Sequence, residues 1–287
     1  MTTVEHVLSV KCHLGEGPLW CARDQRLYWV DAFAGTVHTY HPETGAHGSH
    51  VFDDWVTCIA IRKSGGFVLA MRRKLAFWDG SSARVDTVAE PFPTDKPEMR
   101  FNDGAVDPAG RFWIGGVTNG EYAAPLLRLD PDLSTHEMDR GFSVSNGIGW
   151  TPDRKTMLFT DSPPRKIYAY DYDLATGAIS DRRVFADVPE SLGVPDGLTI
   201  DSAGYTWSAH WDGWRLTRYA PDGSIDRIVP VPVARVTSCI LGGPDLAEMY
   251  VTTAAPGEND TTHQPYAGDL FRLRVDVPGQ PEPEFAG

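Results

Sequence analysis

The sequence predicts an all-β fold, a six-bladed β-propeller with four antiparallel strands in each blade. A short unit recurs along the 287 residues: a polar residue before glycine, an apolar pair, a D-x-x-G type turn, and an aromatic or β-branched run. Successive copies lie 41, 46, 43, 50 and 42 residues apart, which matches the length of a four-stranded blade. No sustained 3.6-residue apolar pattern supports a helical alternative. The copies are anchored on Gly17, Cys58, Gly104, Gly147, Gly197 and Cys239.

The first two strands of each blade come from the recurring unit itself. The polar-glycine dipeptide begins the innermost strand, the D-x-x-G turn ends it, and the aromatic run forms the second strand. Complete copies occupy residues 15–31, 101–116, 145–162 and 195–210, and degenerate copies occupy 57–71 and 237–254.

Third and fourth strands follow in the same order. Alternating segments that end in turn residues are the third-strand candidates, and outer-strand candidates such as 182–188 and 224–231 follow five of them. Prolines after 268–276 disfavour a sixth outer strand there. The N-terminal segment 5–12 (EHVLSVKC) is therefore expected to join the last blade and close the ring, which gives one domain over 1–287. The third-strand candidates are 35–45, 73–80, 124–133, 165–177, 214–223 and 268–276.

Composition narrows the function classes. The net charge of −13, from 26 basic and 39 acidic residues, argues against a nucleic-acid partner, which requires basic patches. No apolar run approaches the length that spans a bilayer, and the N-terminus lacks the features of a signal peptide, so we expect a cytoplasmic protein with no membrane partner. The four cysteines form no CxxC and are expected to be buried free thiols. A monomer or a weak homo-oligomer is expected.

The repeat places polar side chains at one mouth of the central channel, which the innermost strands line. These are Glu16, Asn102 with Asp103, Asn146 and Asp196. Each dipeptide alone is typical of a turn, but four in register favour a functional ring. Converging carboxylates require a proton or a cation, and two carboxylates with an amide oxygen suit a hard divalent ion such as Ca²⁺, Mg²⁺ or Mn²⁺. Asp103 is expected to point away from the channel, because neighbours on a strand alternate, and to tie backbone amides together.

Other chemistries find no support in the sequence. There is no HExxH, GxSxG elbow, P-loop or strand-following GxGxxG. His210 and His263 are expected to be surface histidines, and the tryptophans are expected to pack between blades.

The strings GEGPLW, RFNDGAVDPAGRFWIGG, SNGIGWTPD, PDGLTIDSAGYTW and TSCILGGPDLAEMYVTTA resemble the senescence marker protein (regucalcin), gluconolactonase and luciferin-regenerating enzyme family. The resemblance covers nearly the whole chain and is strongest to the bacterial sugar lactone hydrolases. It implies a six-bladed propeller that binds one divalent metal ion in its channel and hydrolyses sugar lactones. Ca²⁺, Zn²⁺, Mn²⁺, Mg²⁺ and Fe²⁺ are all compatible with what it implies.

The resemblance also implies residue roles. The family's metal ligands match Glu16, Asn146 and Asp196, and Asp196 also matches the catalytic base. Arg100 and Asn102 match the substrate-contacting pair. Animal members carry an acidic pair where this chain reads VTNGEYAAP. Glu121 is the acidic residue of this segment and is a candidate substrate contact, although the family's acidic pair is not present.

The expected reaction is metal-dependent hydrolysis of a sugar (aldono) lactone to the aldonic acid. The divalent ion would polarise the lactone carbonyl, and Asp196 would take a proton from the attacking water. Two alternatives stay open: an organophosphate-type phosphotriesterase on the same metal site, and a non-enzymatic calcium-binding or scaffold propeller.

Overall fold

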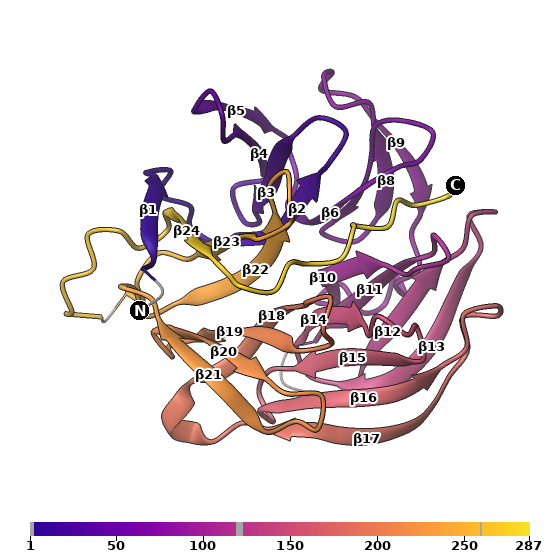
Figure 1. The fold of residues 1–287 in the computed structure, drawn as a ribbon. Coiled ribbons are helices and arrows are strands. Elements are labelled where there is room, and N and C mark those ends of the chain that lie inside the picture. The colour runs from indigo at the N-terminus through magenta and orange to yellow at the C-terminus, as the bar shows by residue number, and fades with distance from the viewer. Residues whose placement is uncertain (1–2, 119–122, 259) are drawn as a thin grey trace.

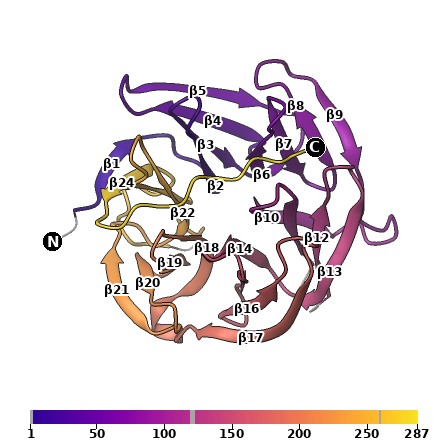
Figure 2. The same ribbon diagram turned by 45° about the vertical axis from the view of Figure 1, so that its right-hand side comes forward.

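The computed structural model describes residues 3–118, 123–258 and 260–287, and it confirms the predicted six-bladed propeller. Six four-stranded antiparallel sheets stand around a central channel, as Figure 1 shows obliquely and Figure 2 from nearer the ring axis. The described residues contain one short 3₁₀ turn, η1 (Glu190–Leu192), and no helix long and apolar enough to cross a membrane.

Each blade runs outward from its innermost strand, in sequence order in blades 1 to 5. Blade 1 contains β2 (Gly15–Cys21), β3 (Arg26–Asp31), β4 (Thr36–His41) and β5 (Ala46–Val51). Blade 2 contains β6 (Val56–Ile61), β7 (Phe67–Met71), β8 (Leu75–Trp78) and β9 (Val85–Ala89). Blade 3 contains β10 (Arg100–Val106), β11 (Phe112–Val117), β12 (Ala124–Leu129) and β13 (Thr135–Phe142).

The second half of the ring repeats this order. Blade 4 contains β14 (Ser145–Trp150), β15 (Thr156–Asp161), β16 (Lys166–Tyr172) and β17 (Ile179–Asp187). Blade 5 contains β18 (Val194–Ile200), β19 (Thr206–Trp211), β20 (Arg215–Tyr219) and β21 (Ile225–Pro230). Blade 6 contains β22 (Val236–Gly242), β23 (Glu248–Thr253), β24 (Leu270–Arg274) and β1 (Glu5–Leu8).

The ring closes through β1, as the sequence predicts. This strand pairs antiparallel with β24, so both ends of the chain contribute to blade 6. The Asp269 carboxylate, just before β24, fixes the join by accepting hydrogen bonds from Ser9 Oγ, from the Val10 and Lys11 amides and from Lys11 Nζ at 2.9–3.3 Å. Within the described residues, β1 thus supplies the fourth strand of blade 6, so that all six blades have four strands.

A β-bulge interrupts every innermost strand near its first residues. In blades 1, 3, 4 and 5 the register shifts across the polar-glycine dipeptide, for example between Glu16 and Leu19 and between Pro195 and Leu198. A bulge adds a residue to one strand and re-aims its side chains. A side chain at Gly147 or at Gly197 would collide with the innermost strand of the next blade, so these glycines let the inner strands approach one another.

Aromatic side chains fill the spaces between the blades. Trp20, Trp29, Trp113 and Trp207 are almost completely buried, and the Trp113 ring meets that of Trp150, on the next blade, at 6.0 Å. The prediction that tryptophans pack between blades is confirmed for these residues. The four cysteines are buried and free, also as predicted.

The segment 277–287, here called the floor segment, crosses the end of the channel opposite the Glu16 mouth. It appears in yellow across the face of the ring in Figure 2. Phe285 is fully buried and exchanges backbone hydrogen bonds with Ile61 and Lys63 at the end of β6. Gln280 Nε2 donates to the Trp150 and Ile200 carbonyls at the ends of β14 and β18. The floor segment therefore ties several blades together where their inner strands finish.

Candidate functional site

The candidate site lies at the mouth where the innermost strands begin. Two buried aspartates at the ends of second strands hold the chain as it enters these inner strands. Asp31 accepts the amides of His13 and Leu14 at 2.8 and 3.0 Å, just before β2. Asp161 accepts the Ser143 and Val144 amides at 3.1 Å, just before β14. These contacts fix the backbone that carries Glu16 and Asn146.

A chain of hydrogen bonds links blades 3, 4 and 5 across this mouth. Arg100 Nη1 donates to Asn102 Oδ1 at 2.7 Å, and Asn102 Nδ2 donates to Asn146 Oδ1 at 2.9 Å. Asn146 Nδ2 then donates to Ser162 Oγ, and that hydroxyl donates to the Pro195 carbonyl, both at 2.7 Å. Every polar atom of the Asn146 amide is thereby oriented, and Ser162 connects it to the residue before Asp196.

Glu16 and Asp196 carry the negative charge of the site. Glu16 is 9% exposed and Asp196 is 4% exposed. Burial, followed by the charges of Asp196 and Asp103, raises the pKa of Glu16 well above its usual range. Burial, followed by the Asp103 charge, likewise raises the pKa of Asp196. Two such carboxylates are ionised together only when a cation lies near them.

One orphaned atom tests whether a metal ion fits these residues. Asp196 Oδ1 is buried and has no hydrogen-bond partner among the described residues, which is costly for a carboxylate oxygen unless a cation binds it. Glu16 and Asn146 add a carboxylate and an oriented amide oxygen, the donor types that hard divalent ions prefer. The residues therefore fit the ion. Among the described residues, no three His, Cys, Asp or Glu side chains form a metal-binding group.

Asp103 differs from its prediction. It does accept a backbone amide, that of Gly104 at 2.8 Å. Its carboxylate nevertheless lies inside the channel, at 8% exposure, where it raises the pKa of Glu16 and Asp196. Burial raises its own pKa to about 6. Strict alternation fails here because the bulge between Phe101 and Gly104 breaks the register.

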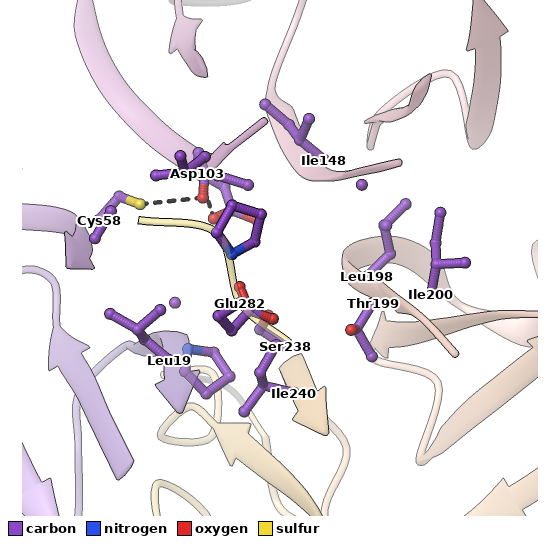
Figure 3. A pocket seen from close by; sticks show the side chains of 18 of the residues that line it. Leu19, Cys58, Asp103, Ile148, Leu198, Thr199, Ile200, Ser238, Ile240 and Glu282 are labelled. Carbon is purple, nitrogen blue, oxygen red and sulfur yellow. Dashed lines mark hydrogen bonds between the residues drawn. The ribbon is translucent and has the colours of Figure 1, made fainter. Parts of the chain in front are cut away.

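Below the carboxylates the channel holds a cavity of about 120 Å³. Figure 3 shows Asp103 and Glu282 among the side chains around it, with Leu19, Leu198 and Ile240 forming part of its apolar wall. Cys58 Sγ contacts the Gly104 carbonyl at 3.2 Å. The floor segment closes the cavity from below through Gln280, Pro281, Glu282 and Pro283.

The sequence also made predictions for Glu121 and His210. Glu121 lies outside the described residues. His210 is fully buried rather than on the surface: its Nδ1 lies 2.8 Å from the Leu192 carbonyl, and its Nε2 has no partner among the described residues. The turn η1 covers this histidine, which the residues around it in the sequence do not reveal. Burial lowers the pKa of His210 to about 4, so the ring is neutral.

Sequence reasoning also missed Ser162. Ser162 completes the chain of hydrogen bonds that orients Asn146. It lies 16 residues after Asn146 in the sequence, and its second partner, the Pro195 carbonyl, belongs to the next blade. Its only sequence signal is its place directly after the second strand of the blade, next to Asp161.

Comparisons with known proteins show similarity along nearly the whole chain. The model of the SMP-30/Gluconolactonase/LRE-like region matches residues 14–255. The chain is 41% identical to pentonolactonase XacC of Haloferax volcanii, covering 98% of this chain and 97% of the relative. It is 35% identical to a 6-deoxy-6-sulfogluconolactonase of Pseudomonas putida, covering 99% of each. The solved structure of a calcium-binding protein, regucalcin, from Agrobacterium tumefaciens superposes with a TM-score of 0.94 at 25% identity, covering 100% of this chain and 98% of that one.

Proposed function

Because this chain belongs to the SMP-30/gluconolactonase/LRE-like family, we propose that it hydrolyses a sugar lactone to the aldonic acid at the channel mouth. Relatives along its whole length are named as lactone-hydrolysing enzymes. The observation that carries the proposal is that Glu16, Asn146 and Asp196 lie buried near the starts of inner strands, with one Asp196 oxygen left without a partner among the described residues. A scaffold protein has no need for such a costly arrangement.

Glu16, Asn146 and Asp196 would hold one divalent ion. When bound, that ion supplies Lewis acidity toward the lactone carbonyl and acidifies water. Asn146 is pre-oriented for this role, because Asn102 and Ser162 occupy its other hydrogen-bonding positions. Ca²⁺, Zn²⁺, Mn²⁺, Mg²⁺ and Fe²⁺ are the candidates.

Asp196 is the proposed general base. Water attacks the lactone carbonyl carbon while Asp196 accepts one of its protons, and the bond from that carbon to the ring oxygen breaks. The proton on Asp196 then passes to the departing ring oxygen, which becomes a hydroxyl group of the product acid. Because a carboxylate that binds a cation is a weak base, this step also requires the water to be acidified by the ion.

Arg100 and Asn102 are the proposed substrate contacts. Arg100 Nη1 is occupied by the Phe101 carbonyl and by Asn102 Oδ1, which holds the guanidinium in one orientation. Its Nε and Nη2 make no hydrogen bond within the described part of the chain and remain for the lactone's oxygen atoms. Holding the ester in one orientation is itself a large part of such catalysis.

A metal-by-lactone activity matrix tests this function. Protein stripped with a chelator is reloaded with each of the five ions and assayed on xylono-, arabinono-, glucono- and galactonolactone and on a phosphotriester. We expect no hydrolysis by the stripped protein, and restored hydrolysis of at least one lactone by at least one ion. Faster turnover of the phosphotriester than of every lactone, or hydrolysis of no lactone with any ion, contradicts the proposal.

A further inference from the structure

Four side chains from three successive blades form a wall beside the proposed metal ligands. Phe33 lies in the β3–β4 turn, Trp55 directly before β6, Arg72 directly after β7, and Arg100 at the start of β10. All four positions are at the mouth where the inner strands begin. We call this set the aromatic-arginine wall.

Ring and guanidinium contacts hold the wall together. The rings of Phe33 and Trp55 meet at 4.6 Å. The Arg100 guanidinium carbon lies 5.7 Å from the centre of the Phe33 ring, and that of Arg72 lies 5.0 Å from the Trp55 ring. Each arginine thus stacks on one ring of an aromatic pair. The Arg72 main chain is anchored as well, because its amide donates to the Trp55 carbonyl and its carbonyl accepts the Phe101 amide.

The two arginines of the wall form no ion pair within the described residues. Within the described ranges neither Arg72 nor Arg100 has a carboxylate within 4 Å of its guanidinium nitrogens. The Arg72 side chain is exposed. In a chain of net charge −13, this makes the wall a local positive region next to a carboxylate site.

Another arginine at the same mouth shows the contrast. Arg235, directly before β22, stacks on the Trp211 ring at 4.4 Å. Its Nε lies 3.4 Å from Asp212 Oδ1, and its Nη1 donates to the Ala255 carbonyl. Arg235 therefore has protein partners for its charge and its N–H donors, whereas the guanidinium group of Arg72 is exposed to solvent.

The aromatic part of the wall is also open. Phe33 is 38% exposed, a large apolar side chain beside a polar mouth. An aromatic face of this kind suits the C–H face of a sugar ring, and the arginine forks suit a carboxylate, sulfonate or phosphate group. Phe33 stands beside Arg100, which also feels the charge of Glu16, so the wall continues outward from the proposed metal site.

We propose that the aromatic-arginine wall is a substrate subsite for an anionic oxyacid group on the exocyclic carbon of a sugar lactone, an inference that rests on the lactonase function proposed above. The lactone carbonyl lies at Glu16, Asn146 and Asp196, the sugar ring lies against Phe33, and the remote anionic group reaches Arg72. The preferred substrates are therefore lactones that carry an anionic group in addition to the lactone ester.

Kinetics on matched substrates tests the subsite. Glucono-1,5-lactone is compared with 6-phosphoglucono-1,5-lactone and with glucaro-1,4-lactone, which separates a phosphate from a carboxylate. We expect Arg72→Gln to lower the preference for at least one anionic lactone, as a ratio of kcat/KM values, by about tenfold, mainly through KM. Arg72→Lys should restore part of it, and Arg235→Gln should leave the ratio unchanged. An unchanged ratio in R72Q, or an equal fall in R235Q, overturns the proposal.

Binding measurements separate this proposal from the lactonase function. Calorimetry with 6-phosphogluconate, glucarate and gluconate requires no turnover. We expect R72Q to weaken binding of a doubly anionic acid about tenfold more than that of gluconate. Equal weakening of all three acids overturns the subsite. Selective weakening without hydrolysis of any lactone supports the subsite and contradicts the lactonase function.

Discussion

Ser162 is the side chain that connects two proposed metal ligands from neighbouring blades. Its hydroxyl accepts from Asn146 Nδ2 and donates to the Pro195 carbonyl, and both bonds are buried. Partners of this kind set the orientation of the ligand that they touch. We therefore expect Ser162→Ala to weaken binding of the divalent ion about 10- to 100-fold with the fold retained.

Calorimetric titration of stripped protein with Ca²⁺ and Mn²⁺ measures the effect of Ser162→Ala. Thr160→Ala is the matched control: Thr160 lies two residues earlier, is fully buried, and its Oγ1 has no partner among the described residues. It should leave the affinity for the ion unchanged. Equal affinities for wild type and S162A contradict the positioning role.

Asp196 combines a catalytic role with a cost in stability. Asp196→Asn keeps the shape of the side chain but removes its proton-accepting capacity, so hydrolysis should fall at least about 100-fold. The raised pKa of Asp196 means that its ionisation opposes folding as pH rises through that pKa. At pH 8 the metal-free variant should therefore unfold at a higher temperature than the metal-free wild type. Hydrolysis at the wild-type rate, or a lower unfolding temperature, contradicts this assignment.

The sequence predicted which residues meet at the site better than it predicted how they are oriented. Repeat register alone predicts Glu16, Asn146 and Asp196 at one mouth. In the structure each of them lies near the start of an inner strand, and the charges of Glu16 and Asp196 interact. Strand alternation failed for Asp103, because a bulge changes the local direction of side chains. Ser162 was missed because its partners lie on different strands, a kind of contact that linear spacing does not encode.

The turns after β10 and β18 each hold a buried carboxylate. Asp107, at the end of β10, is fully buried. Asp201 occupies the same place after β18 and accepts hydrogen bonds from Trp207 Nε1 and from Arg218. The partners of Asp107 are the amides of Ala109 and Arg111, Arg111 Nη1, Trp113 Nε1 and the Tyr172 hydroxyl.

We expect Asp107→Ala to lower the free energy of unfolding by about 3–5 kcal/mol, because it leaves a buried cation and buried donors without their acceptor. Urea unfolding followed by tryptophan fluorescence measures the change. Asp173→Ala is the control: Asp173 also accepts turn donors, the amide and hydroxyl of Thr176, but on the exposed surface. A loss in D107A no larger than the loss in D173A contradicts the role of Asp107 as a buried anchor.

The order of the strands within each blade was predictable from the sequence, but the packing of the floor segment was not. Four strands per blade follow from alternation and turn residues, which are local properties, and the structure agrees in all six blades. Prolines in 277–287 correctly excluded a long strand. They carry no information on where a non-repetitive segment packs, and its contacts with the ends of β6, β14 and β18 are all long-range.

At the scale of the whole molecule, the ring has one open mouth and one closed end. The proposed catalytic residues stand at the open mouth, and the floor segment closes the other. Glu282 projects into the cavity between them, among side chains that are mostly apolar. The residue is half-buried, and burial raises its pKa to about 7 from an ordinary value of 4.5.

The sign of this pKa shift makes stability depend on pH. Folded protein holds the Glu282 proton more tightly than unfolded protein, so stability is lost as pH rises from about 4.5 to about 7. Glu282→Gln is neutral throughout and should raise the free energy of unfolding at pH 8 by about 2 kcal/mol, with little change at pH 4.5. Urea unfolding of metal-free protein between pH 4.5 and 8 measures this. Glu284→Gln is the control, because Glu284 lies in the same segment but pairs with Arg23 on the surface. If E282Q and E284Q keep the same pH slope as wild type, Glu282 is not the titrating group, and the closed end of the channel is hydrated well enough to hold a charge.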